Sequence, residues 1–155
     1  MTRPMKKLLI VHHTASPTLQ EMFEAVRSGA TAEEIADAVD VTVQPALAAG
    51  AVDVLAADGY LLGTPVNIGY MSGALKHFFD LVYYPCLEAT AGRPYGLYLH
   101  GNSDATGAVR AVESITTGLR WERVRPPVVV TGELGRDDLA ACWELGAVVA
   151  ATVAE

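Results

Sequence analysis

The stretch "LLGTPVNIGYMSGALKHFFD", residues 61–80, begins as a buried strand and ends as an amphipathic helix. Its first residues form a short apolar run, and its second half places Leu75, Phe78 and Val82 at helical spacing. Between the two lies a predicted loop, Gly63 to Gly73, which contains no charged residue. Ordinary connections between a strand and a helix run to roughly 2–6 residues, and this one is longer. The loop therefore predicts a ligand site at the end of the strand.

The same alternation of strand and helix recurs along the whole chain. Short aliphatic runs predict strands at 7–11, 39–43 and 60–63, in "RPYGLYLHG" up to His100, and in "VVVTG". Apolar stripes at helical spacing predict helices at 19–26, 71–82, 108–119 and 139–153, and a shorter helix is expected around Gly50. The segment "TAEEIADA", residues 31–38, has the spacing of a capping box at Thr31 and Glu34 and predicts a short helical turn.

Strand alternation with helices predicts a parallel sheet that is covered by helices on both faces. The segment "VDVTV", residues 39–43, alternates apolar and polar side chains and is therefore expected at a half-exposed edge. An edge position for the second strand favours the order 2-1-3-4-5. With no linker or repeat in the sequence, we expect residues 1–155 to form a single α/β domain with a doubly wound, five-stranded, flavodoxin-like sheet.

The composition excludes several classes of function. Eleven basic and eighteen acidic side chains give a formal charge of −7, which argues against binding to nucleic acid or to anionic membranes. The apolar runs are too short to span a bilayer, and the basic start "MTRPMKK" is not followed by a secretory signal. Cys86 and Cys142 lack metal-ligand spacing and are interpreted as reduced thiols. We therefore expect a cytoplasmic protein.

In open parallel sheets the ligand binds beyond the carboxyl ends of the strands, where the strand order reverses. The turn "HHTASPT", residues 12–18, lies there and offers hydroxyls at Thr14, Ser16 and Thr18 just before a helix. Free amides and the helix dipole at such a position bind anions, and the turn contains no lysine or arginine. The alternative is that these residues only cap the helix.

The loop from Gly63 to Gly73 has a complementary chemistry. Its glycines and Asn67 allow the backbone to approach a ligand closely. Backbone amides and carbonyls can bind the polar edge of a flat heterocycle, and apolar side chains can contact its face. The side chains available for that contact are Pro65, Val66, Ile68 and Met71.

The run "GTPVNIGYMSGALKHFFD" resembles the loop and helix that contact the flavin ring in one branch of the flavodoxin superfamily, the NAD(P)H-dependent FMN reductases and WrbA-like quinone reductases. The turn "HHTASPT" is similar to the flavin phosphate loop of that superfamily, although Ala15, Ser16 and Pro17 replace the usual Thr-Gly-Asn run before Thr18. The likeness in organisation covers nearly the whole chain.

The resemblance implies a set of FMN-binding residues at three turns. Thr14, Ser16 and Thr18, with the backbone of the same turn, would hold the phosphate. The loop after the third strand would line the ring, and the turn after the fourth would close over its pyrimidine side. The full predicted set is His13, Thr14, Ala15, Ser16, Pro17, Thr18, Pro65, Val66, Asn67, Ile68, Gly69, Met71, His100, Gly101 and Asn102.

Other sites are less well supported by the sequence. His12 and His13 could meet His100, but neighbouring strand residues point to opposite faces, and no metal is predicted. A phosphorelay receiver would need acidic residues where His12 and His13 stand, and no G-x-S-x-G nucleophile elbow is present. Ser103 and Asp104 are interpreted as a helix cap, and Cys86 as a packed thiol.

The resemblance implies an oxidoreductase in which NADPH or NADH reduces FMN and the flavin reduces a quinone-like acceptor. The alternatives are an electron-transfer protein that is reduced by a redox partner protein, and a flavin-free module that shares only the fold. No catalytic side chain is predicted, and a homodimer is considered. The aromatic sandwich of the electron carriers is not evident, because Tyr70 is the only aromatic residue in the two ring-side segments.

Overall fold

The structure is a computed structural model that describes residues 4–155. Residues 1–3, part of the basic start from which we predicted no secretory signal, lie outside the described residues. The elements are β1 (Lys6–His12), α1 (Pro17–Ala30), β2 (Val39–Pro45), α2 (Ala51–Ala56), β3 (Gly59–Asn67), β4 (Tyr70–Met71), α3 (Gly73–Cys86), β5 (Pro94–Gly101), α4 (Thr106–Gly118), β6 (Glu122–Arg123), β7 (Val128–Thr131) and α5 (Arg136–Ala154).

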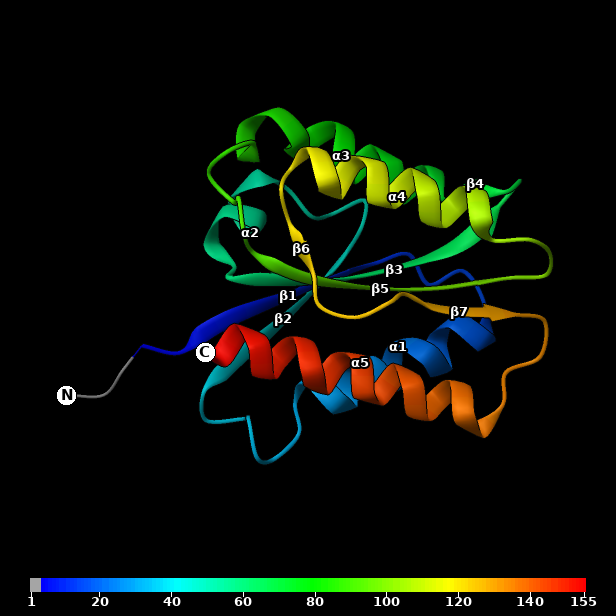
Figure 1. The fold of residues 1–155 in the computed structure, drawn as a ribbon, viewed down its shortest axis with the longest axis horizontal. Coiled ribbons are helices and arrows are strands. Elements are labelled where there is room, and N and C mark those ends of the chain that lie inside the picture. Colours follow the sequence, from blue (N-terminus) through cyan, green and yellow to red (C-terminus); the bar gives the residue numbers. More distant parts are fainter. Residues whose placement is uncertain (1–3) are drawn as a thin grey trace.

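A twisted sheet lies between two layers of helices (Figure 1). The helices α2, α3 and α4 cover one face, and α1 and α5 cover the other. Successive residues of β1 alternate between the two cores, because Leu9 and Val11 pack on the first face and Leu8 and Ile10 on the second. The predicted continuous aliphatic strand, buried on both faces, is therefore confirmed.

The strand order confirms the flavodoxin-like arrangement. The path runs β2-β1-β3-β5, all parallel, and both β6 and β7 pair with the far edge of β5. In the order of chain positions this is 2-1-3-4-5, with the fifth strand divided into two short pieces. Pro126 and Pro127 lie in the break, and a proline cannot donate a ladder hydrogen bond. The alternating strand β2 lies at the opposite edge, as predicted.

Two local predictions need correction. The segment 31–38 forms hydrogen-bonded turns, in line with the predicted short helical turn, but Thr31 does not cap it, because Thr31 caps the carboxyl end of α1. Its hydroxyl donates to the Arg27 carbonyl at 2.8 Å. The predicted loop from Gly63 to Gly73 is largely a β-hairpin, because β3 continues to Asn67 and returns as β4.

The hairpin turn has an unusual backbone. Ile68 and Gly69 are its central residues, and both have positive φ angles, 52° and 71°. This is the arrangement of a type I′ turn, which Asn-Gly pairs adopt readily and β-branched residues rarely adopt. The sequence signal for a hairpin was therefore weak, and tertiary contacts must hold Ile68 in this conformation.

Candidate functional site

The three predicted segments meet at the carboxyl edge of the sheet, on the right of Figure 1. Parallel register places the ends of β1, β3 and β5 side by side, since His12 pairs with Gly63 and Pro65 pairs with His100. The strand order reverses between β1 and β3, so the edge coincides with the switch point at which ligands bind in open α/β sheets.

The turn between β1 and α1 is both a helix cap and a source of free donors. Ser16 is the N-cap, and its hydroxyl oxygen accepts from the Leu19 amide at 3.2 Å. Within residues 4–155, the amides of Thr14, Ala15, Ser16 and Thr18 donate no intramolecular hydrogen bond. Unpaired amides at a helix amino terminus form an anion site, so capping and anion binding are compatible in this turn.

Two histidines stand at the entrance to the turn. The His12 ring stacks on Phe23 of α1, with centroids 4.3 Å apart, and its Nδ1 lies 2.8 Å from Thr14 Oγ1. Burial, with smaller contributions from His13 and Arg27, lowers the pKa of His12. The Nδ1 atom of His13 is buried without a hydrogen-bond partner among the described residues, which leaves a polar atom available to a ligand.

The tip of the hairpin is exposed to solvent, and the residues at its two ends pack toward the core. Asn67, Ile68 and Gly69 are exposed, whereas Pro65 is buried and Val66 is half-buried. Met71 is only 2 % exposed and lies in the core with Leu75 and Phe78. The predicted contact between the Met71 side chain and a flavin ring is therefore not available in this structure.

Two glycines let the hairpin approach the β5–α4 connection closely. A Cβ atom on Gly101 would lie 2.7 Å from Val66 Cβ, and one on Gly107 would lie 2.4 Å from the Gly69 carbonyl oxygen. The two segments predicted to enclose a ring therefore touch each other. A flat ligand would lie across their common outer surface and not in a slot between them.

The turn after β5 is fixed by hydrogen bonds to the turn after β7. The Nε2 atom of His100 lies 2.8 Å from the Gly132 carbonyl, which can only accept, so Nε2 carries the proton. The Gly132 amide donates to the Gly101 carbonyl at 2.9 Å. Asn102 is exposed. The N-cap of α4 is Ala105 and not the predicted Ser103 or Asp104. Asp104 instead accepts from the Thr106 hydroxyl and amide, and these bonds lower the pKa of its carboxyl.

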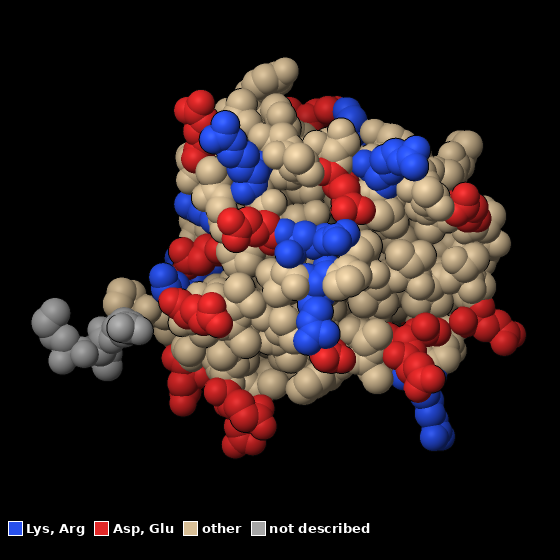
Figure 2. All heavy atoms as spheres, in the orientation of Figure 1, with Lys and Arg blue, Asp and Glu red and all other residues tan. Residues whose placement is uncertain are grey.

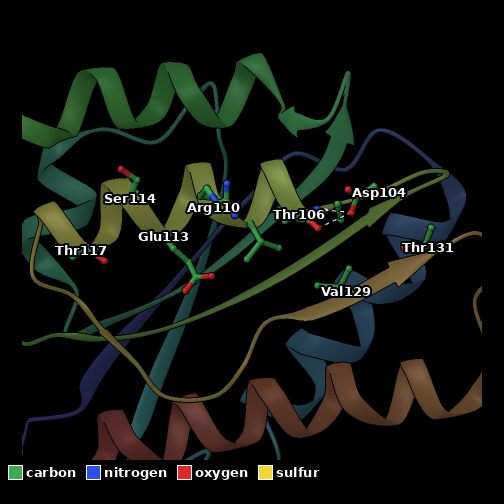
Figure 3. A pocket seen from close by; sticks show the side chains of 10 residues that line it. Asp104, Thr106, Arg110, Glu113, Ser114, Thr117, Val129 and Thr131 are labelled. Atoms are coloured by element: carbon green, nitrogen blue, oxygen red, sulfur yellow. Dashed lines mark hydrogen bonds between the residues drawn. The ribbon is translucent and has the colours of Figure 1, made fainter.

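A large groove lies beside this site and was not predicted from the sequence. It has a volume of about 750 Å³ and runs between α4 and β7, beginning near Asp104 and Thr131 (Figure 3). Glu113 points from α4 toward the gap in Figure 3 and is paired with Arg123 at 2.9 Å. The groove borders the divided fifth strand, and the consecutive prolines at 126 and 127 were the sequence signal that could have indicated it.

The surface around the carboxyl edge carries few charges. In Figure 2 the right-hand side is mostly uncharged, and acidic side chains gather where α5 begins. Residues 4–155 contain no group of three His, Cys, Asp or Glu side chains that could hold a metal ion. In the same residues, no helix combines the length and the apolar character needed to cross a membrane.

The cysteines are packed thiols, as predicted. Cys86 and Cys142 are buried and unpaired, and they lie in the cores on opposite faces of the sheet. Burial raises the pKa of Cys86, and it raises the pKa of Cys142 to about 12. A thiol with a raised pKa is a poor nucleophile at neutral pH, so neither residue has the character of a redox centre.

A doubly wound sheet, with a turn of unpaired amides and an uncharged hairpin at its switch point, defines a flavodoxin-like α/β protein. The family model for NADPH-dependent FMN reductase matches residues 12–134. The chain therefore belongs to this family of flavoprotein oxidoreductases.

Individual relatives agree on the fold. A flavodoxin from Aquifex aeolicus is 36 % identical over 76 residues, which are 49 % of this chain and 40 % of that protein, so the match spans less than half of either. A flavodoxin from the domain Archaea superposes with a TM-score of 0.76 at 18 % identity, covering 96 % of this chain and 99 % of the other. The WrbA-like protein from Agrobacterium tumefaciens superposes with a TM-score of 0.74 at 18 % identity, covering 97 % and 98 %.

Proposed function

We propose that this protein binds FMN at the carboxyl edge of its sheet, takes electrons from NADPH or NADH, and passes them to a quinone-like acceptor. The observation that carries the proposal is the turn at residues 13–18, whose four unpaired amides and three hydroxyls lie beside an uncharged hairpin at the switch point. The family to which the chain belongs supports both the cofactor and the reductant.

The residues fit FMN in two ways. The amides of Thr14, Ala15, Ser16 and Thr18 are free to donate to a phosphate group, and the helix dipole of α1 favours its negative charge. The exposed backbone of Asn67, Ile68 and Gly69 offers donors and acceptors without charge, which suits a neutral ring. FMN, when bound, would supply the hydride chemistry, and the protein would hold and orient it.

A second candidate function is electron transfer without a nicotinamide reaction. It is supported by the flavodoxins among the relatives. Tyr70, which is 42 % exposed, is the only aromatic side chain of the hairpin or of the turn at residues 100–105. A ring at this site would therefore lack an aromatic partner on each face, which favours the reductase over the carrier.

A titration followed by a reduction tests the proposal. Adding FMN to apo-protein should quench the flavin fluorescence and shift its absorption bands. Under anaerobic conditions, NADPH or NADH should then bleach the bound flavin, and a quinone such as menadione should restore it. Unchanged fluorescence at micromolar FMN would refute the flavin site. Bleaching that requires an added reductase protein would instead favour the electron carrier.

The cellular setting is part of the same proposal. Two buried, unpaired thiols support a reducing compartment such as the cytosol. A homodimer remains a prediction, which sedimentation of the FMN-loaded protein at several concentrations would test.

A further inference from the structure

His12 is the last residue of β1, and the structure fixes its ring between two elements. The imidazole stacks on Phe23 of α1 with an interplanar angle of 26°. Its Nδ1 atom lies 2.8 Å from Thr14 Oγ1 in the turn that begins α1. A 180° flip of the half-buried ring would keep its stacking on Phe23 but would lose the contact between Nδ1 and Thr14 Oγ1.

The direction of this hydrogen bond decides what Thr14 can offer a ligand. A threonine hydroxyl has one proton. If the hydroxyl donates to an unprotonated Nδ1, it has no proton left for a phosphate oxygen, which can only accept. If Nδ1–H donates to Oγ1, the hydroxyl proton is free to point into the turn. Burial lowers the pKa of His12, so at neutral pH the ring is uncharged and the choice is between two tautomers.

We infer that His12 is a positioning residue for the flavin phosphate: its Nδ1–H donates to Thr14 Oγ1 and thereby turns the Thr14 hydroxyl proton toward a phosphate oxygen. The inference rests on the proposed function, because it requires FMN with its phosphate in this turn. It goes beyond that function by giving a role to a side chain outside the predicted binding set. The turn has no lysine or arginine, so the orientation of each hydroxyl carries a larger share of the affinity.

Three variants separate this role from a packing role. His12→Phe keeps a ring that can stack on Phe23 but removes the donor. His12→Asn places an amide N–H near the position of Nδ1. Thr14→Val keeps the shape of Thr14 without its hydroxyl. Each is titrated with FMN and with riboflavin, which lacks the phosphate, and thermal unfolding of the apo-proteins reports on folding.

We expect His12→Phe to weaken FMN binding about tenfold, because the Thr14 hydroxyl is no longer held with its proton toward the charged phosphate, and to leave riboflavin binding unchanged. His12→Asn should recover most of the loss. In the Thr14→Val background, His12→Phe should add little, because the hydroxyl that it orients is gone. Nitrogen-15 NMR of the FMN complex should show the proton of His12 on Nδ1.

Three binding results would overturn the inference while leaving the proposed function intact. These are unchanged FMN binding in His12→Phe, an equal loss of FMN and riboflavin, and additive losses in the double variant. A His12 ring protonated only on Nε2 in the complex would also overturn it. If the unaltered protein binds no FMN, the proposed function fails first and this inference fails with it.

Discussion

The turn after β1 and the hairpin after β3 lie side by side at the same edge, but they are built in opposite ways. Among the described residues, the turn leaves the amides of residues 14, 15, 16 and 18 unpaired, next to three hydroxyls of which that of Thr18 makes no hydrogen bond. The hairpin pairs its strands, packs Val66 against Gly101 and packs its tip at Gly69 against Gly107. The turn thus offers charge-binding donors, and the hairpin offers a fixed shape. Substitutions in the turn should therefore change the binding of ligands that carry a phosphate, and substitutions in the hairpin should change the binding of any ligand with the flavin ring.

The largest effect should come from a negative charge in the turn. Ser16→Asp keeps a good N-cap, because aspartate caps helices about as well as serine, so the folded protein should be as stable as before. Its carboxylate would face the phosphate, and a juxtaposition of like charges costs several kcal/mol, so FMN binding should fall by about a hundredfold or more. Isothermal titration with FMN and riboflavin measures the difference.

The matched control is Ser16→Asn, which has the same shape and capping ability without the charge. Riboflavin should bind both variants equally well. Equal FMN affinity in the Asp and Asn variants would place the phosphate elsewhere.

The next largest effect should come from the contact that holds the hairpin. Gly107→Ala would put a methyl group 2.4 Å from the Gly69 carbonyl oxygen, so the hairpin or α4 must shift. Overpacking of this kind costs about 1–3 kcal/mol, and we expect FMN and riboflavin to lose affinity together, by about tenfold or more. Hydrogen exchange at residues 66–71 should rise.

Gly73→Ala is the control for Gly107→Ala. Gly73 also lies in the first turn of a helix, and a Cβ atom there meets nothing within 4 Å. If Gly107→Ala weakened FMN binding but not riboflavin binding, the hairpin would not contact the flavin ring.

A smaller effect should follow from removing one hydroxyl of the turn. The Thr18 hydroxyl makes no hydrogen bond within the described residues, so it is free to donate to a phosphate. Thr18→Val keeps the shape and should weaken FMN binding by about ten- to a hundredfold, without changing riboflavin binding. If FMN and riboflavin both bind as tightly as before, the Thr18 hydroxyl does not contact the phosphate.

The sequence predicted the fold and the location of the site from patterns that depend on neighbouring residues. The aliphatic run of β1 and the alternation of β2 gave the two-sided sheet and its edge strand, and both are confirmed. Met71 was predicted to begin a helical stripe that faces the core. It lies in β4, before α3 begins, although its side chain does face the core. The contact with a flavin ring that was also predicted for Met71 conflicted with its place in that stripe. In the structure the Met71 side chain is buried.

What the sequence did not reveal depends on contacts between distant segments. The hairpin was predicted as a loop because Ile68 is a poor residue for a left-handed turn, and its tip is held against α4 by the close approach of the Gly69 carbonyl to Gly107. The direct contact of Val66 with Gly101 and the groove beside β7 arise in the same way. Periodicity carries no information about such pairs.

The smallest expected effect is at Ile68, where the hairpin holds a β-branched residue at φ 52° with its side chain fully exposed. The left-handed conformation costs such a residue about 1–2 kcal/mol, and asparagine adopts it more easily. Ile68→Asn should therefore stabilise the apo-protein by about 1 kcal/mol and raise its Tm by about 3 °C.

Glu88→Asn is the control, because Glu88 is exposed at φ 71° beyond the carboxyl end of α3 and is not β-branched, so its gain should be smaller. If the exposed isoleucine is kept to contact the ring, the same variant should weaken FMN and riboflavin binding alike by a few fold. A lower Tm for Ile68→Asn would show that the turn is not strained, and the hairpin would then owe its shape to local preference instead of packing.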